Sequence, residues 1–312
     1  MKVSVIISNY NYARYLPDAI SSVLAQTYAN IELVIVDDGS TDDSRTVITD
    51  YQQKAPDIIK AIFQENQGQG AAFNTAFAAS TGDVIAFLDA DDVWKPHKLQ
   101  RIVDKFNSAA NIAGVMHPLN LIDADDNVID DLSNEWLPNG DLANIVLDTG
   151  HAWNYPPTSG LAYRRSALAK VLPMDAVKWR LCADGCLVYC TAFLGSIEGI
   201  HEVLASYRIH GSNNHADDSV SLEKQLRSLS GIEMTNRYLN DFLDNISYPV
   251  RVDLARNLQY RRSRYYLKKQ WNLSEAVAIS NLILSWRFYN WRERVNYLAR
   301  FWAKSAGFLI GS

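Results

Sequence analysis

Short apolar runs alternate with helical patterns through the first 90 residues, and this alternation limits the fold more than any other feature. The runs are residues 3–7, 32–36, 58–63 and 84–88. Their length and β-branched residues are typical of buried strands. Strands joined by helices form largely parallel sheets. The sequence therefore predicts an α/β protein with a mixed, mostly parallel sheet flanked by helices.

Polar side chains follow each of these four runs. They occupy residues 8–12, 37–42, 66–70 and 89–92. Ligands of open parallel sheets bind in the crevice at the carboxyl ends of the strands. We therefore expect the four polar segments to meet at one site.

The fourth polar segment contains three carboxylates in four positions, Asp89, Asp91 and Asp92. Charges beside a buried strand are costly unless a cation meets them. Mg²⁺ or Mn²⁺ is typically held by one or two carboxylates together with substrate phosphate oxygens. The same four letters recur at residues 123–126, between two short apolar pairs, and there they predict a hairpin turn.

The second half of the chain is less regular. We expect a helix from about residue 97 to 107, a helix over 184–194, and strands over 112–117, 158–163 and 203–209, with loops over 132–157. A helical pattern then begins near residue 219, so the expected boundary lies within 213–218 and separates residues 1–215 from 216–312. Cys182, Cys186 and Cys190 are spaced by four, which indicates one helix face rather than a zinc site.

Six segments, taken in order, resemble the motifs of family 2 glycosyltransferases with a Rossmann-like GT-A fold. They are residues 3–11, 36–42, 66–74, 87–91, 183–184 and 207–212. The resemblance covers about residues 1–215. It implies inverting transfer of a sugar from a nucleotide diphosphate donor, usually a UDP-sugar, with Mn²⁺ or Mg²⁺ as cofactor. It also implies a nucleotide-sugar-binding half at 1–110 and an acceptor-binding half at 111–215.

The resemblance assigns the donor site to the polar segments. Tyr10 would stack on the base, and Asp37 or Asp38 would hydrogen-bond its edge; a loop aromatic and a turn aspartate are the alternatives. Asp91 would coordinate the metal, and Asp89 would reach the ribose or the metal through water; a solvated acidic turn is the alternative. The full donor set implied is Ser8, Tyr10, Asn11, Asp37, Asp38, Asn66, Gly68, Asn74, Asp89, Ala90 and Asp91.

Inverting transfer needs a carboxylate that takes the proton of the attacking hydroxyl. By the resemblance this base is Asp184; the alternative is that Asp184 caps a helix. The family commonly has Glu-Asp here, whereas this chain has Ala183 before Asp184. The family also often has Arg where this chain has Phe73. His210 is either a further metal or diphosphate ligand or a structural histidine.

The acceptor would lie near Thr158 and Ser159 by the same resemblance. Trp153 and Tyr155 could offer a flat face to an acceptor sugar, and ordinary core packing is the alternative. A saccharide or a lipid-linked saccharide is the expected acceptor.

Charge is distributed unevenly. Residues 251–312 carry 12 Lys/Arg against 3 Asp/Glu, although the whole chain has a net charge of −5. Their aromatic residues interleave with cations, which suits either an anionic membrane surface or packing against the catalytic domain or a second subunit. No apolar run approaches the length of a transmembrane helix. We expect a cytoplasmic protein, free or peripheral at the inner face of the membrane, without a nucleic-acid partner.

Two other functions remain open from sequence. A sugar-nucleotide nucleotidyltransferase has a related fold, but residues 8–12 lack its glycine-rich, basic first loop. A non-catalytic nucleotide-sugar binder is the other, and it would have no need of Asp184 beside Asp89 and Asp91.

Overall fold

The computed structural model describes residues 1–131, 136–210 and 221–310, in two compact units. The first unit comprises Met1–Leu142 and Tyr155–Asp217, and the second comprises Ala143–Asn154 and Asp218–Ser312. A short segment within the expected catalytic domain is thus grouped with the carboxyl-terminal helices. The expected boundary at 213–218 lies outside the described residues.

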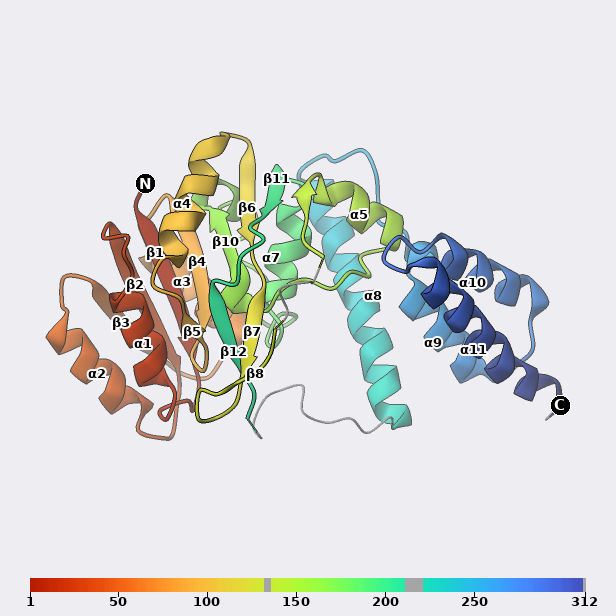
Figure 1. Cartoon of the computed structure of the whole chain (residues 1–312), viewed down its shortest axis with the longest axis horizontal. Helices are drawn as coiled ribbons and strands as arrows, with labels where there is room; N and C mark the ends of the chain where they lie inside the picture. Colours follow the sequence, from red (N-terminus) through yellow and green to blue (C-terminus); the bar gives the residue numbers. More distant parts are fainter. Residues whose placement is uncertain (132–135, 211–220, 311–312) are drawn as a thin grey trace. The chain divides into compact units, whose positions relative to one another are not determined.

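A mixed sheet of eight described strands forms the centre of the first unit, in the order β3-β2-β1-β4-β10-β6-β11-β9 (Figure 1). The first four run parallel, and β10 is antiparallel to both of its neighbours. This confirms the predicted α/β class. The strands are β1 (Val3–Asn9), β2 (Ile31–Asp38), β3 (Ile59–Gln64), β4 (Val84–Asp89), β6 (Ile112–Met116), β9 (Asn139–Gly140), β10 (Leu161–Arg164) and β11 (Ser196–Gly199).

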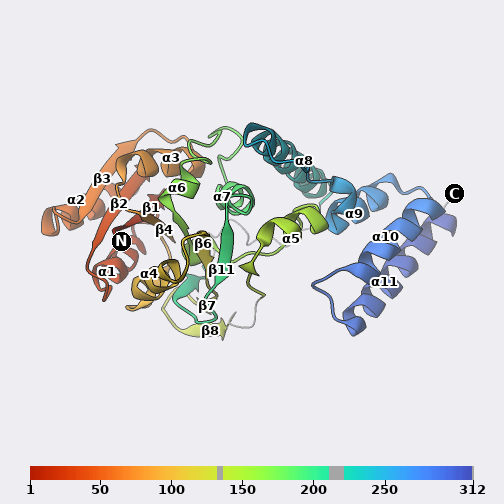
Figure 2. The same cartoon turned by 90° about the horizontal axis from the view of Figure 1, so that it is seen from above.

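Helices cover both faces of this sheet, as Figure 2 shows. Alternate residues Val3, Val5 and Ile7 of β1 belong to a buried cluster with residues of α1, α2 and α4. On the other face, the ring of Phe73 from α3 lies 4.8 Å from that of Phe87. The helices of this unit are α1 (Leu16–Leu24), α2 (Ser44–Lys54), α3 (Gln69–Ala79), α4 (Lys98–Ser108), α6 (Arg165–Leu168) and α7 (Asp184–Thr191).

A smaller sheet has the order β5-β12-β7-β8. Its strands are β5 (Val93–Trp94), β7 (Leu119–Ile122), β8 (Val128–Asp131) and β12 (Ala205–Arg208). β12 runs parallel to β7, and Arg208 pairs with Ile122. The expected turn between β7 and β8 forms at Asp123, whose carboxylate accepts hydrogen bonds from the backbone nitrogens of Asp125 and Asn127. The carboxyl ends of β7 and β12 therefore lie side by side.

Three expectations about secondary structure are wrong. Residues 158–160 form a 3₁₀ turn, η1 (Thr158–Gly160), before β10, because Ser159 uses its side-chain and carbonyl oxygens to bond Asp89 and Trp94 and does not pair along a strand. α5 (Leu142–Thr149) lies in the part expected to be loops. Cys182 precedes α7 with a φ of 54°, so only Cys186 and Cys190 are buried on that helix.

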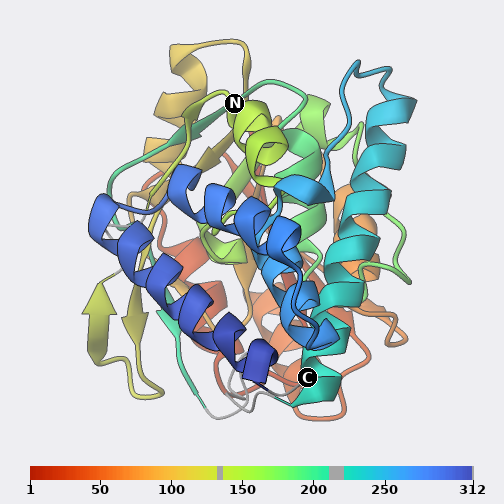
Figure 3. The same ribbon diagram turned by 90° about the vertical axis from the view of Figure 1, so that its right-hand side faces the viewer.

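The second unit is helical, as expected. Its core contains residues of the three successive helices α9 (Leu258–Lys268), α10 (Leu273–Ser285) and α11 (Trp291–Ile310). Among them are Tyr265 and Phe301, whose rings lie 5.5 Å apart. Figure 3 shows these three helices (blue) side by side. None of the described helices is both long and apolar enough to cross a membrane. Besides α5 and these three helices, the elements are α8 (Leu222–Asn245) and η2 (Leu254–Arg256).

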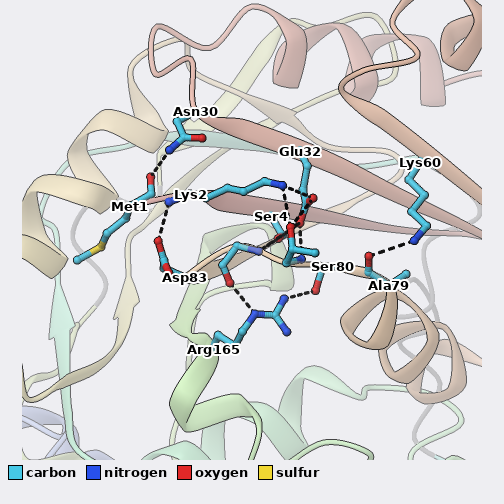
Figure 4. Close-up of polar contacts among 12 residues, drawn as sticks. Met1, Lys2, Ser4, Asn30, Glu32, Lys60, Ala79, Ser80, Asp83 and Arg165 are labelled. Atoms are coloured by element: carbon cyan, nitrogen blue, oxygen red, sulfur yellow. Dashed lines mark hydrogen bonds and ion pairs between the residues drawn. The ribbon is translucent and has the colours of Figure 1, made fainter.

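A hydrogen-bond network closes the amino-terminal edge of the parallel strands (Figure 4). The Glu32 carboxylate accepts hydrogen bonds from Lys2 Nζ at 2.6 Å, from Ser4 Oγ at 2.5 Å and from Thr81 Oγ1 at 2.9 Å. Burial opposes the ionisation of Glu32, but these bonds outweigh it and lower its pKa to about 2. The network therefore favours the ionised carboxylate and links β1 and β2 to the turn before β4.

Replacing this carboxylate with an amide, Glu32→Gln, should lower the free energy of unfolding by about 1–2 kcal/mol at pH 7. The folded pKa of Glu32 lies below the ordinary value, so its contribution is complete above about pH 4.5 and is lost as the pH falls toward 2. Urea unfolding at pH 7 and pH 3.5 should show a smaller difference at the lower pH. The exposed control Glu65→Gln should change little at either pH, and a pH-independent Glu32→Gln effect would contradict the assignment.

Candidate active site

The strand register brings the predicted polar segments to one edge of the sheet. Ser8 on β1 pairs with Asp89 on β4 and with Val36 on β2, and Asn9 pairs with Asp37. The polar segments that follow β1, β2 and β4 therefore meet, as the sequence predicts.

The loops after β1 and β2 are joined by Asp37. Its buried carboxylate accepts hydrogen bonds from Asn9 Nδ2 at 2.8 Å and from Ser40 Oγ at 2.5 Å. Ser40 Oγ in turn accepts the Asn11 backbone N–H at 2.9 Å, and Asn11 has a φ of 61°. Tyr10 next to it is 46% exposed, so its ring is accessible to a flat ligand.

Asp38 fixes the loop that precedes α3. Its oxygens accept hydrogen bonds from Gln64 Nε2 at 2.7 Å, from Gln67 N at 2.9 Å and from Gly68 N at 2.7 Å. Gly68 has a φ of +92°, and a Cβ there would lie 2.4 Å from Arg180 Cγ. Only glycine fits this position. The predicted contacts of Asp37, Asp38 and Gly68 with a nucleotide stay predictions.

Arg180 brings a cation to this loop, which sequence analysis did not single out. Its Nη2 donates to Asn66 Oδ1, and its carbonyl oxygen accepts the Gln69 N–H at 2.9 Å. Asn74 instead exchanges two 2.8 Å hydrogen bonds with the backbone of Met174. The sequence shows only that Phe73 stands where the family often has an arginine. Only the folded chain shows that Arg180 is the cation that reaches the loop.

Four carboxylates gather where β4 ends. Asp89 is the last residue of the strand and Asp91 and Asp92 follow it, with Ala90 buried between Asp89 and Asp91. Burial raises the pKa of Asp89, and the charges of Asp92, Asp91 and Asp184 raise it further. Burial and the charge of Asp91 likewise raise the pKa of Asp92. The structure thus brings together the aspartates that sequence analysis assigned to metal binding and to base catalysis.

Asp184 is the first residue of α7, and the N-cap is Ala183, so the alternative that Asp184 caps this helix is wrong. A carboxylate in the first turn is still favoured by the helix dipole. Asp184 is partly buried. Burial, followed by the charge of Asp184, raises the pKa of both Tyr155 and Tyr189. These two phenols therefore stay protonated beside the carboxylate.

His210 contacts Asp91 directly. Its Nε2 lies 3.0 Å from Asp91 Oδ2, and the side chains are only 6% and 10% exposed. The imidazole stacks on Tyr15, with ring centroids 4.8 Å apart, and meets the edge of Tyr12. These contacts hold the ring in one orientation next to the acidic cluster.

The donor types at this cluster suit a divalent cation. Carboxylates are ligands of Mn²⁺ and Mg²⁺, and crowded negative charges are relieved by a cation. Within the described parts of the chain, no group of three or more such residues could hold an ion by itself.

Arg208 links both copies of the Asp-Ala-Asp-Asp sequence. Its side chain is 1% exposed; Nε donates to the Asp91 carbonyl oxygen at 2.9 Å and Nη2 pairs with Asp126 Oδ1 at 2.8 Å. Its backbone N–H donates to Asp92 Oδ1 at 2.9 Å. The second copy of this sequence is therefore a turn, as predicted. Its Asp126 also pairs with Arg208, the cation that supports the first copy. Sequence analysis quoted Arg208 within a motif but assigned it no role.

Thr158 and Ser159 lie directly against Asp89. Ser159 Oγ accepts the Asp89 backbone N–H at 3.0 Å. A hydrogen bond from Thr158 lowers the pKa of Asp89, but burial and the neighbouring aspartates raise it by more. The Ser159 carbonyl oxygen accepts a hydrogen bond from the buried Lys98. Trp153, only 6% exposed, belongs to the second unit, so the structure does not group it with the other two predicted acceptor residues.

Comparison with known proteins identifies the family. The family model described as Glycosyl transferase family 2 matches residues 4–172, more than half of the chain. An uncharacterized glycosyltransferase of Nostoc sp. is 62% identical over 314 residues, covering 100% of this chain and 97% of the relative. The chain belongs to glycosyltransferase family 2.

More distant proteins resemble this glycosyltransferase in part or in fold. A Bacillus subtilis protein named for teichuronic acid biosynthesis is 40% identical over 99 residues, 32% of this chain and 39% of that protein. Staphylococcus aureus TarS with UDP-GlcNAc matches with a TM-score of 0.59 at 18% identity, covering 100% and 93% of the two chains. A Pyrobaculum calidifontis mannosyltransferase with GDP-Man and Mn²⁺ matches at 0.54 and 16%, covering 99% and 85%. The structural matches show that the fold is GT-A.

Removing the buried cation of this glycosyltransferase by Arg208→Met should lower the free energy of unfolding by about 3 kcal/mol, because the Asp91 carbonyl oxygen and the Asp126 carboxylate would lose their partner and Asp92 would lose a nearby positive charge. Urea unfolding measures the change. The control Arg14→Met removes a cation that is 67% exposed and lies 3.8 Å from Asp125, so a change of at most about 0.5 kcal/mol is expected. Equal effects of the two substitutions would contradict the supporting role of Arg208.

Proposed function

We propose that this family 2 enzyme transfers a sugar from a nucleotide diphosphate donor, with UDP as the preferred nucleotide, to a hydroxyl group of a saccharide or lipid-linked saccharide. Transfer inverts the configuration at the anomeric carbon. The observation that carries the proposal is the gathering of Asp89, Asp91 and Asp184 at the carboxyl edge of a GT-A sheet.

In this proposal the donor base stacks on Tyr10, because an accessible aromatic ring desolvates a base efficiently. Ser8, Asn11 and the aspartates after β2 supply polar groups around it. Asn66 and Gly68 lie in the loop that would be nearest the diphosphate. Asn74, on the helix that follows this loop, holds the helix in place by its hydrogen bond to Met174. The likeness to a structure with bound UDP-GlcNAc supports UDP, whereas the likeness to one with GDP-Man keeps GDP as a competitor.

Asp91 and Asp89 would hold Mn²⁺ or Mg²⁺, with His210 placed to contact the ion or the diphosphate. When bound, such an ion neutralises the diphosphate and makes it a better leaving group. The Asp91–His210 contact holds both side chains in place, and Arg208 holds the backbone on which Asp91 and Asp92 lie. The Mn²⁺ in the mannosyltransferase structure supports this assignment.

Asp184 is the proposed general base. It would accept the proton of the acceptor hydroxyl while that oxygen attacks the anomeric carbon on the face opposite the departing diphosphate. The acceptor would lie near Thr158 and Ser159, which contact Asp89. Tyr155 and Tyr189, which stay protonated, are placed to donate hydrogen bonds at this position rather than to compete as bases.

The cellular role proposed is surface polysaccharide biosynthesis, which the teichuronic acid relative supports. A lipid-linked acceptor would bring the enzyme to the inner face of the membrane. The cation-rich region 251–312 would then contact anionic lipid or a second copy of the chain, and the aromatic Trp291, 70% exposed, is available for either contact.

Converting the proposed base to an amide, Asp184→Asn, should lower the transfer rate by roughly 10²–10⁴-fold, because an amide cannot accept the hydroxyl proton. UDP affinity should stay within about twofold, since Asp184 does not contact the nucleotide in this proposal. The checks are transfer kinetics with UDP-sugars and UDP titration calorimetry. Asp175→Asn, in the exposed segment before α7, is the control, and unchanged turnover in Asp184→Asn would remove Asp184 as the base.

Nucleotide and metal dependence can be tested together by thermal unfolding with UDP, GDP or dTDP. Ligand at about 100 times Kd stabilises by about 2.7 kcal/mol, which corresponds to a rise in Tm of about 5 °C. We expect this rise for UDP with Mn²⁺ and its loss with EDTA or in Asp91→Asn. Asp125→Asn changes the same position of the second Asp-Ala-Asp-Asp sequence and should keep the full rise. A larger rise with GDP would overturn the preference for UDP.

A further inference from the structure

A cavity of about 490 Å³ lies within the second unit, lined by residues of η2, α9, α10 and the connection between these two helices. Cavities of this size commonly hold small ligands. Arg261, Arg264 and Lys268 line it from α9. Their spacings of three and four residues place them on one face of the helix.

The cations of this cavity outnumber its acids. Arg261 forms a two-point contact with Glu275, with distances of 2.9 and 2.6 Å. The hydrogen bond from Arg261 lowers the pKa of Glu275, and the charges of Lys268 and Arg264 lower it further. Among the residues that the structure describes, neither Arg264 nor Lys268 forms an ion pair. Two positive charges are therefore left over in a concave site, where the field is focused.

Arg264 is held in position before any ligand binds. Its Nη1 donates to the Tyr260 hydroxyl at 3.0 Å, and that hydroxyl donates to Glu233 Oε1 at 2.6 Å. The guanidinium carbon lies 5.3 Å from the centre of the Tyr260 ring. A side chain already held in this way loses less conformational entropy on binding.

Aromatic rings adjoin the cations. Tyr260, Tyr265 and Trp271 line the same cavity. The indole of Trp271 packs against Trp302, with ring centroids 5.9 Å apart and an interplanar angle of 58°. Aromatic faces desolvate readily against the C–H faces of sugar rings, and guanidinium groups match the geometry of phosphate and carboxylate.

We propose that this cavity binds an anionic saccharide, with Arg264 and Lys268 contacting its phosphate or carboxylate group and Trp271 contacting the adjoining sugar ring. A saccharide fits this concave site with aromatic walls better than a flat lipid surface does. The binding is independent of the catalytic site. The cavity would hold an acceptor chain that carries negative charges, and this role rests on the proposed function.

The test is calorimetric titration of the full-length protein at low salt with glucose 6-phosphate, glucuronic acid, neutral glucose and inorganic phosphate. Both anionic sugars should bind at least about tenfold more tightly than glucose, and glucose 6-phosphate more tightly than inorganic phosphate. The double substitution Arg264→Gln with Lys268→Gln should weaken them by at least about tenfold. Trp271→Leu should weaken glucose 6-phosphate binding but leave that of inorganic phosphate unchanged.

The matched control is Arg262→Gln with Lys269→Gln, which removes two charges from the same segment outside the cavity lining. It should keep saccharide affinity within about twofold. Equal losses in both double variants, or equal binding of inorganic phosphate and glucose 6-phosphate, would overturn the proposal. So would flotation with phosphatidylglycerol vesicles that depends on Arg264 and Lys268 without binding of the soluble sugars.

Two further measurements separate this proposal from the proposed function. Asp184→Asn should bind the anionic sugars like the unaltered protein, because the cavity does not contain this residue. The cavity double variant should keep transfer to a small neutral acceptor but raise KM for an anionic acceptor chain. Absent sugar binding with intact transfer would remove the cavity assignment alone, and absent transfer with intact sugar binding would remove the catalytic proposal alone.

Discussion

Repulsion among the aspartates at the end of β4 is the constraint on which the rest of the structure depends. Asp89, Asp91 and Asp92 lie close together, and neighbouring negative charges raise the pKa of Asp89 and of Asp92 in addition to the effect of burial. Such a group is stabilised by protonation or by nearby cations. Arg208 reaches it from the smaller sheet. Lys98 Nζ on α4 donates to the Ser159 carbonyl oxygen, and burial lowers the pKa of this amine. A divalent ion with a phosphate would complete this balance.

The two edges of the parallel strands differ in how well the protein's own groups compensate their carboxylates. At the amino-terminal edge, hydrogen bonds from Lys2, Ser4 and Thr81 satisfy Glu32 and lower its pKa. At the carboxyl edge, burial and neighbouring carboxylates instead raise the pKa of Asp89 and of Asp92. Satisfied charges stabilise a fold, whereas charges left in excess are suited to bind a ligand. The proposed catalytic function therefore belongs to the edge where the protein's own groups do not fully compensate the charge.

The regular elements were predictable because each depends on a local pattern. The strands ending at Asn9, Asp38 and Asp89 and the helix α4 follow from apolar runs and flanking polar residues. The helix α5 was missed. Residues 158–160 were missed as well, because contacts decide them: the side-chain and carbonyl oxygens of Ser159 bond Asp89, Trp94 and Lys98, which lie far away in sequence. Arg180 and Arg208 were missed for the same reason, since no spacing in the chain relates them to residues that lie far away in sequence.

The sequence by itself determined the α/β alternation, the family resemblance and the aspartates expected at the strand ends, because these depend on local periodicity and short motifs. The flanking residues predicted a turn for the second of the two identical Asp-Ala-Asp-Asp segments, but only the tertiary structure showed which charges each segment meets. One follows a buried strand of the main sheet and lies close to Asp184, whereas the other closes an exposed hairpin and pairs with Arg208. The two segments have the same amino-acid sequence. Electrostatic energy depends on the distance to other charges and on the exclusion of water, and both are set only in the folded chain.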